Sequence, residues 1–314
     1  MTQTPPVLLI AFNRPDRLAR LIDAVRIAAP ERVYLAVDGP RPDRPEDVAA
    51  VQACRDLVAA VDWTPDVHVL DRVSNLGCGR AVSGAIDWFF EHEDCGIILE
   101  DDLVPEPSFF SFCAELLERY RDVPEVFAIS GCNVVPAEHC SGSAPYRFTQ
   151  IPQIWGWATW RRTWQSYALD ISGWRRDLPL RHRWSVMGHS LAGVAYWSAL
   201  FDLLAQRRID TWDGQLVFAA MRSGGLTAIT NHNLVVNDGF GPEATHTVRR
   251  PDFLLPTAAI EAPLPDVAVR VDRRADRWMR VVAYRATWWG LVRQAARYLS
   301  HRREQGRANK GAPW

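Results

Sequence analysis

The stretch Gly96-Ile-Ile-Leu-Glu-Asp-Asp102 decides the fold of this chain. Its apolar run Ile97–Leu99 is short and uninterrupted, which is typical of a strand buried on both faces of a sheet. Three carboxylates, Glu100, Asp101 and Asp102, follow at once, and we call them the carboxylate triplet. In open parallel sheets, ligands bind outside the carboxyl ends of the strands. The triplet therefore stands where chemistry is expected.

Outward from this strand, apolar runs alternate with helix-like stretches. Such alternation predicts an α/β fold with a mainly parallel sheet and helices on both faces. After about residue 135 the alternation stops, and we expect the second half to complete the same domain. The predicted strands are Val7–Phe12, Val33–Asp38, Val67–Leu70, Ile97–Leu99 and Val126–Ser130, and the predicted helices are Arg17–Ala28 with Asp16 as its cap, Glu46–Ala60, Arg80–Glu91 and Pro107–Arg121.

The composition restricts the class of protein. The chain has 314 residues, of which 48% are hydrophobic and 23% charged, so disordered and fibrous classes are excluded. No apolar run approaches the length of a membrane-spanning helix, and the N-terminus lacks the basic stretch and cleavage site of a signal peptide. The six Cys form no CxxC pair and are expected to be reduced, mostly buried thiols. These features predict a cytoplasmic protein.

The formal charge of −1 is an average of two unlike regions. Residues 266–314 carry 12 basic and 4 acidic residues, a net of +8, which leaves −9 for residues 1–265. Residues 270–303 have the pattern of basic helices with interleaved Trp and Val, and residues 304–314 are expected to form a disordered tail. One interpretation is that these helices lie at the surface of an anionic membrane. An equally good one is that they pack on the domain and expose their basic face to solvent. Nucleic-acid binding lacks a recognition motif.

The carboxylate triplet carries the most chemical information. Adjacent carboxylates repel one another, so a cation or several donors must offset the cost. Mg²⁺ and Mn²⁺ prefer oxygen ligands and commonly bridge carboxylates to substrate phosphates. The alternative is a solvated acidic turn. The turn Asn75–Gly79 fits a phosphate cradle at a helix N-terminus, and equally an ordinary strand-to-helix turn; it matches neither a dinucleotide fingerprint nor a P-loop.

Several motifs occur in an order that resembles the nucleotide-sugar glycosyltransferases of the GT-A fold. The chain looks closest to the branch around N-acetylglucosaminyltransferase I (family 13) and its bacterial family-2-like relatives. The resemblance implies a catalytic domain over residues 1–248, with a donor half 1–133 and an acceptor half with closing loop 134–248, followed by a helical extension 249–314. The matching segments are Pro6–Arg14, Val37-Asp38, Asn75–Arg80, Ile97–Asp102, Pro107–Phe110, Ile129–Asn133, Trp155–Trp157, Trp212-Asp213 and Asn237–His246.

The resemblance also implies a role for each matching residue. A divalent cation, Mn²⁺ or Mg²⁺, would be bound by Asp102 and His246. Asp213 matches the base of an inverting transfer; capping of the following helix is the alternative, and Asp210 is the nearest rival base. Gly214-Gln215 departs from the animal enzymes, which carry a carboxylate or an aromatic residue after the base. The donor-binding residues would be Arg14, Asp38, Asn75, Arg80, Glu100 and Asp101, and the closing loop would be formed by Gly239, Phe240 and Gly241.

Tryptophan is concentrated in the second half of the chain, where seven of the 14 Trp lie between Trp155 and Trp197. A surface rich in Trp and Arg suits a glycan, because the C–H faces of sugars pack on aromatic rings. The helical spacing of Trp157, Trp160 and Trp164 favours core packing instead. The candidate acceptor-binding residues are Trp155, Gly156 and Trp157.

Together these features predict a metal-dependent hexosyl- or N-acetylhexosaminyltransferase. It would move a sugar from a nucleotide-diphospho-sugar, with UDP as the expected nucleotide, to a hydroxyl of a glycan or of an envelope or lipid-linked acceptor. One alternative is a sugar-nucleotidyltransferase, which normally has a Gly-rich loop and a basic residue after the first strand, where this chain has Asn13-Arg14-Pro15. Another is a degenerate, non-catalytic domain that binds at the inner membrane face.

Overall fold

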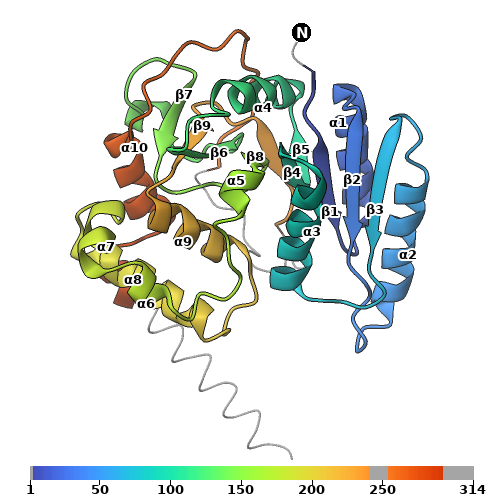
Figure 1. Cartoon of the computed structure of the whole chain (residues 1–314), viewed down its shortest axis with the longest axis horizontal. Coiled ribbons are helices and arrows are strands. Elements are labelled where there is room, and N and C mark those ends of the chain that lie inside the picture. Colours follow the sequence, from blue (N-terminus) through green and yellow to red (C-terminus); the bar gives the residue numbers. More distant parts are fainter. Residues whose placement is uncertain (1–2, 241–253, 293–314) are drawn as a thin grey trace, which may run out of the picture.

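The computed structural model describes residues 3–240 and 254–292. Within them, eight strands form one mixed sheet in the order β3-β2-β1-β4-β8-β6-β9-β7 (Figure 1). The pairs β1–β2, β1–β4, β2–β3 and β6–β9 are parallel, and β4–β8, β6–β8 and β7–β9 are antiparallel. The prediction of an α/β fold with a mainly parallel sheet flanked by helices is confirmed.

The first 130 residues fold as their pattern predicts, with each element within two residues of its expected bounds. The elements are β1 (Val7–Ala11), α1 (Pro15–Ala28), β2 (Arg32–Val37), α2 (Glu46–Ala59), β3 (Asp66–Asp71), α3 (Cys78–His92), β4 (Cys95–Glu100), α4 (Pro107–Arg119) and β6 (Val126–Ser130). Asp16 does not cap α1, because Pro15 starts the helix earlier and Arg14 takes the N-cap position. The short strand β5 (Leu103–Pro105) was not predicted.

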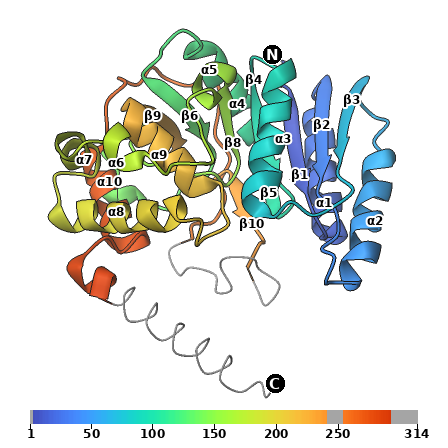
Figure 2. The ribbon, with the colours of Figure 1, turned by 60° about the horizontal axis from the view of Figure 1, so that its bottom comes forward.

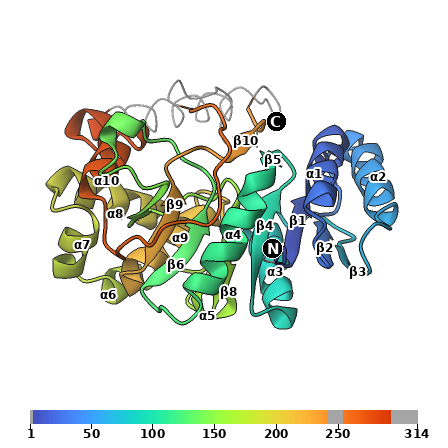
Figure 3. The ribbon, with the colours of Figure 1, turned by 90° about the horizontal axis from the view of Figure 1, so that it is seen from above.

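Alternation along β1 divides the core between the two faces of the sheet. Val7 and Leu9 belong to a cluster that includes residues of α1, α2 and α4. Leu8 and Ile10 face the opposite way, into a cluster with residues of α3 and α9 (Asp213–Ser223). Figure 3 shows these helices on either side of the strands. Because both faces are covered, ligands have access to these strands only at their ends.

The second half contributes strands to the same sheet. Strand β8 lies between β4 and β6, so residues of both halves alternate across the sheet. The division at residue 248 therefore stays a prediction. The elements of this half are the single turn η1 (Ala137–His139), β7 (Tyr146–Thr149), β8 (Trp157–Trp160), α5 (Arg161–Trp164), α6 (Trp174–Asp177), α7 (Leu180–Val186), α8 (Leu191–Ala205), α9, β9 (Leu226–Thr230) and β10 (Val235–Asn237).

The basic C-terminal region packs on the domain where it is described. Helix α10 (Arg273–Trp278) continues into the π-helical turn η2 (Met279–Ala283), and Figure 2 shows α10 beside α7. The buried Asp276 carboxylate accepts a hydrogen bond of 2.6 Å from the Thr149 hydroxyl of β7. The predicted tail 304–314 lies outside the described residues. None of the helices described is long and apolar enough to cross a bilayer.

Candidate functional site

A second, two-stranded sheet brings distant residues to the carboxylate triplet. Strand β5 begins directly after the triplet and pairs antiparallel with β10, so Asn237 lies opposite Leu103. As a result, the backbone N–H of Asp238 donates to the carbonyl oxygen of Asp102 at 2.9 Å. The pairing therefore carries the start of the predicted closing loop to the end of β4.

Gly239 lies directly against the Asp102 carboxylate. A Cβ atom at this position would stand only 2.1 Å from Asp102 Oδ2, so no larger residue fits without a shift. The role of this glycine in a closing loop stays a prediction. Gly241 and His246, the other loop glycine and the predicted second metal ligand, lie outside the described residues.

One guanidinium group faces the three carboxylates. Arg14 follows β1, and its Nη1 donates to Asp101 Oδ1 at 3.3 Å and to Asp102 Oδ2 at 2.9 Å. The second oxygen of Asp101 accepts a hydrogen bond of 3.3 Å from the backbone N–H of Phe12. The ends of β1 and β4 are adjacent in the sheet, which explains why these side chains meet. Among the described residues, Arg17 adds a second positive charge that acts on Asp101, but the three carboxylates still outnumber the cations near them.

The protonation of the triplet reflects this shortage. Burial, and after it the charges of Asp102, Asp101 and Asp213, together raise the pKa of Glu100 to about 8, although the charge of Arg14 opposes the shift. Burial also raises the pKa of Asp101 to about 6, although the charge of Arg14 opposes that shift. Strongly raised carboxyl pKa values in a buried cluster are a mark of functional sites. Added positive charge would therefore be stabilising here.

Asp102 is the described residue that could offer an oxygen ligand to a divalent cation. In the described part of the chain no group of three or more His, Cys, Asp or Glu side chains is placed to hold a metal ion by itself. Mg²⁺ is usually held by one or two carboxylates, with substrate phosphates and water completing its shell. Asp102 is partly exposed and supplies such an oxygen ligand. This donor set suits Mg²⁺ or Mn²⁺ better than a soft metal.

Asp38 and Asn75, both predicted to bind the donor, are in contact with each other. The Nδ2 atom of Asn75 donates to Asp38 Oδ2 at 2.8 Å, and the N–H of Leu76 donates to the same carboxylate at 3.1 Å. Asp38 is buried, and desolvation raises its pKa, although these donors oppose the shift. The pair therefore fixes the turn after β3 against the end of β2. Arg80 lies exposed on the first turn of α3.

The N-terminus of α3 is already filled by a carboxylate of the chain itself. Gly79 N–H donates to Asp210 Oδ1 at 3.0 Å, and a Cβ atom on Gly77 or Gly79 would approach this carboxylate within 2.6 or 2.8 Å. The Asn75–Gly79 turn is thus a strand-to-helix turn closed by Asp210, and a phosphate cradle there is not supported. The sequence analysis named Asp210 only as a rival base. Its contact with Gly79 joins residues 131 positions apart, so no local sequence pattern predicts it.

Asp213 is the first residue of α9, and Trp212 rather than Asp213 takes the N-cap position. Its Oδ1 accepts hydrogen bonds from the Gly214 N–H at 2.8 Å and from the Thr211 hydroxyl. Both of these bonds from described residues fall on Oδ1, which leaves Oδ2 to accept a proton. The charge of Asp213 contributes to the raised pKa of Glu100.

The acceptor prediction is wrong for Trp157. Its side chain is 1% exposed and stacks on Trp212 with ring centroids 5.7 Å apart, because β8 lies between β4 and β6 and both its faces are covered. Trp160 and Trp164 are also buried, although they lie on β8 and α5 rather than on one helix. Core packing thus explains this part of the Trp cluster.

Trp155 and Gly156 lie close to the loop residues that follow β10 beside the carboxylate triplet. Trp155 is partly exposed, meets Phe240 edge-on at 5.8 Å, and lines a cavity of about 50 Å³ beside β10. Gly156 has a φ of +70°, and a Cβ there would meet Val235 at 2.6 Å. Its role is therefore one of backbone shape.

Asp47, a buried residue of α2, was missed by the sequence analysis. Its carboxylate accepts from Arg41 Nε at 2.6 Å, from Arg41 Nη2 at 2.9 Å and from Asn13 Nδ2 at 2.7 Å. These bonds hold its pKa below the usual range. Asp47 thereby ties the loop after β1 to the loop after β2. In the sequence it is indistinguishable from an ordinary acidic residue in a first helical turn.

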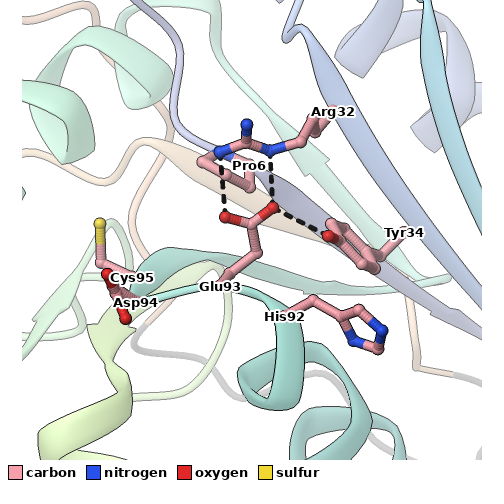
Figure 4. A pocket seen from close by; sticks show the side chains of 7 residues that line it. All are labelled: Pro6, Arg32, Tyr34, His92, Glu93, Asp94 and Cys95. Carbon is pink, nitrogen blue, oxygen red and sulfur yellow. Dashed lines mark hydrogen bonds and ion pairs between the residues drawn. The ribbon is translucent and has the colours of Figure 1, made fainter.

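A cavity of about 530 Å³ lies at the opposite edge of the sheet, where the parallel strands begin (Figure 4). Glu93 occupies its centre and is bound by Arg32 Nε at 2.6 Å and by the Tyr34 hydroxyl at 2.8 Å. Figure 4 shows this carboxylate satisfied from both sides. The arrangement is a paired structural network, so the carboxyl edge is the better candidate for chemistry.

No protein-family model matches this sequence. Among solved structures, the chain is similar to HddC from Yersinia pseudotuberculosis, with 9% sequence identity and a TM-score of 0.31 over 52% of this chain and 80% of that chain. So distant a likeness says nothing of the chemistry of this chain.

Proposed function

We propose that this protein is a metal-dependent glycosyltransferase that takes its sugar from a nucleotide-diphospho-sugar. The observation that carries the proposal is the carboxylate triplet at the end of β4, where Arg14 is the described residue that bonds to two of the three carboxylates and the backbone of Gly239 lies against Asp102. A diphosphate with its divalent cation fits a site with an excess of carboxylates and an open metal ligand. UDP is the nucleotide that we expect.

In this proposal Asp102 holds the cation, and Arg14 holds Asp101 and Asp102 in place. When bound, the cation would neutralise the charge that develops on the departing diphosphate. Glu100 and Asp101 would accept hydrogen bonds from hydroxyl groups of the donor. The Asp38–Asn75 contact would fix the shape of the edge on which the nucleoside rests.

Asp213 is proposed as the base. Its Oδ1 is fixed by Gly214 and Thr211, so the carboxylate cannot rotate freely, and Oδ2 remains to take the proton of an acceptor hydroxyl. The resemblance of Trp212-Asp213 to the family's catalytic segment supports this role, and the charge of Asp213 contributes to the raised pKa of Glu100. Trp155, at the rim beside Phe240, is the described aromatic residue best placed to pack on an acceptor sugar.

The experiment is turnover of a panel of UDP-sugars with Mn²⁺, measured as UDP release with and without glycan acceptors. Replacing Asp213 by Asn should lower turnover by about 10²–10⁴, because general-base catalysis contributes that much, while UDP affinity stays within twofold. Asp210→Asn is the matched control, since it tests the rival base. If Asp213→Asn turns over at the wild-type rate, the base is assigned wrongly; UDP binding without any turnover would favour a non-catalytic module.

A sugar-nucleotidyltransferase is the second candidate, and one observation favours it. A basic residue after the first strand is expected in such enzymes, and Arg14 occupies that position and reaches the carboxylates. The Gly-rich loop that should accompany it is absent from Asn13-Arg14-Pro15. Incubation with a nucleoside triphosphate and a sugar 1-phosphate distinguishes the two, because only a nucleotidyltransferase would release pyrophosphate.

A further inference from the structure

Five large apolar side chains stay exposed in the last described segment. They are Val281, Val282, Trp288, Trp289 and Val292, and we call them the tryptophan surface. Trp289 is 77% and Trp288 60% exposed. Most of the other described Trp side chains are buried or half-buried. Two adjacent exposed indoles are costly in water, which indicates a surface that is covered in use.

The segment that carries these side chains is anchored to the domain. Tyr284 lies with its ring 5.2 Å from that of Trp197 and accepts a hydrogen bond of 3.1 Å from Gln153. Met279 and Ala286 are buried on either side of it. The apolar side chains are therefore presented from a fixed base.

A second group of exposed apolar residues lies close to this segment. The turn between α7 and α8 contacts η2, since a Cβ on Gly188 would stand 2.2 Å from Arg280 Cζ. This turn is flanked by three exposed apolar side chains, those of Leu180, Trp184 and Leu191. Figure 2 shows the red segment that follows α10 passing beside α7 and α8. The exposed apolar area thus extends beyond one short segment.

Positive charge surrounds the apolar side chains. The exposed arginines of this region are Arg181, Arg273, Arg274, Arg277 and Arg285. Two of the nearby acids, Asp272 and Asp276, are buried and used internally, by Ser141 and Thr149. Glu138, whose carbonyl oxygen accepts from Arg274, is exposed. By sequence, residues 293–314 add six basic residues and one acidic residue. The covering partner must therefore accept apolar groups and carry negative charge.

These requirements discriminate between partners. A symmetric contact with a second copy would place arginines against arginines, which is unfavourable. A nucleic acid would use the indoles and arginines but would leave the valine and leucine side chains without stacking partners. An anionic bilayer can bind the indoles, the aliphatic side chains and the arginines together. Indoles and aliphatic side chains enter its interfacial region, while arginines pair with its headgroups.

We propose that the tryptophan surface, together with the exposed side chains of α7 and α8, docks this protein on an anionic lipid bilayer. The inference does not depend on the proposed reaction, since none of these residues belongs to the carboxylate site.

The test is flotation of the full chain with phosphatidylcholine vesicles that contain or lack phosphatidylglycerol. We expect binding to the anionic vesicles alone, weakened by added salt because part of the attraction is electrostatic. The double variant Trp288→Ser/Trp289→Ser should bind at least about tenfold more weakly, since binding scales with the apolar area inserted. Ile27→Ser on α1 is the matched control, because it also removes an exposed apolar side chain, 74% exposed, and should leave binding unchanged.

Thermal unfolding of each variant shows that it is folded. Equal flotation of the wild type and the double variant would overturn the proposal, and so would equal binding to neutral vesicles. Two further results would also overturn it: Trp-dependent binding to RNA without vesicle binding, or Trp-dependent dimerisation in sedimentation velocity without vesicle binding.

Discussion

Both edges of the sheet carry carboxylates with little exposure to solvent, but the number of donors around these carboxylates differs between the edges. At the amino edge, Glu93 meets Arg32 and Tyr34, and both of its oxygens have charged or hydroxyl donors. At the carboxyl edge, Arg14 bonds to both Asp101 and Asp102, and Glu100 forms no ion pair with a described residue, although the charge of Arg14 acts on it. The first arrangement is complete in itself, whereas the second lacks positive charge.

This contrast indicates how the sheet separates structure from chemistry. Paired groups at the amino edge stabilise the first residues of β2 and β4. In the cavity there, the charge of Glu93 is balanced by that of Arg32. The carboxyl edge is also held by paired groups, such as Asp47 with Arg41, but only around its rim. The triplet is the part left unbalanced, and an unbalanced buried cluster is retained where a ligand completes it.

The largest expected loss of stability concerns the rim. Replacing Asp47 by Asn removes a buried charge that three side-chain donor atoms and a backbone N–H share, and should lower the free energy of unfolding by about 3 kcal/mol. Urea denaturation measures this loss. Asp43→Asn, an exposed neighbour, is the control and should change stability by less than about 0.5 kcal/mol. Equal losses in both would show that the rim network contributes nothing specific.

A smaller loss should follow at the amino edge. Glu93→Gln weakens the bonds to Arg32 and Tyr34, which should lower the free energy of unfolding by about 2 kcal/mol. UDP affinity should remain within twofold, because this cavity lies at the other end of the strands. Asp94→Asn, whose side chain is 91% exposed, is the control. A large loss of UDP binding in Glu93→Gln would contradict the division between the edges.

A third effect is a dependence on pH. The folded pKa of Glu100, about 8, lies above the ordinary value of 4.5, so folding favours its protonated form. The resulting stability is fully present below about pH 4.5 and is lost as pH rises through 8. Glu100→Gln cannot ionise, and we expect its stability relative to wild type to increase by at least about 1.4 kcal/mol between pH 5 and pH 9, the equivalent of one pKa unit.

Thermal melts in EDTA, without donor, measure this difference. Glu91→Gln, an exposed neighbour on α3, should show no such trend. A constant difference between Glu100→Gln and wild type across the pH range would mean that Glu100 ionises normally in the fold.

The sequence predicted those parts of the fold that depend on local pattern. Buried strands such as β1 and β4 are continuous apolar runs, and their order along the chain places their carboxyl ends at one edge. Asp38 and Asn75 were each expected at this edge, but their contact with each other was not predicted. Strands β5 and β10, with three residues each, are too short to show any periodicity.

The features that the sequence did not predict depend on contacts between residues far apart in the chain. Asp210 accepts a hydrogen bond from the Gly79 N–H, and Asp47 accepts one from the Asn13 side chain. The sequence around either residue looks the same as that around a solvent-exposed aspartate. The burial of Trp157 follows from the position of β8 in the sheet, which composition does not reveal. Side chains that satisfy one another across the fold are thus the hardest to recognise from sequence.

The most direct test of the central claim is the affinity for UDP measured by calorimetry with Mn²⁺ and with EDTA. Asp102→Asn removes the charge of the proposed metal ligand, and Asp71→Asn, at the end of β3 on the same edge, is its control. We predict that Mn²⁺ strengthens UDP binding of wild type and of Asp71→Asn by at least about tenfold, and that Asp102→Asn loses this gain. UDP binding that is equal with Mn²⁺ and EDTA, or a full Mn²⁺ effect in Asp102→Asn, would contradict the assignment of the carboxylate triplet as a nucleotide-sugar site.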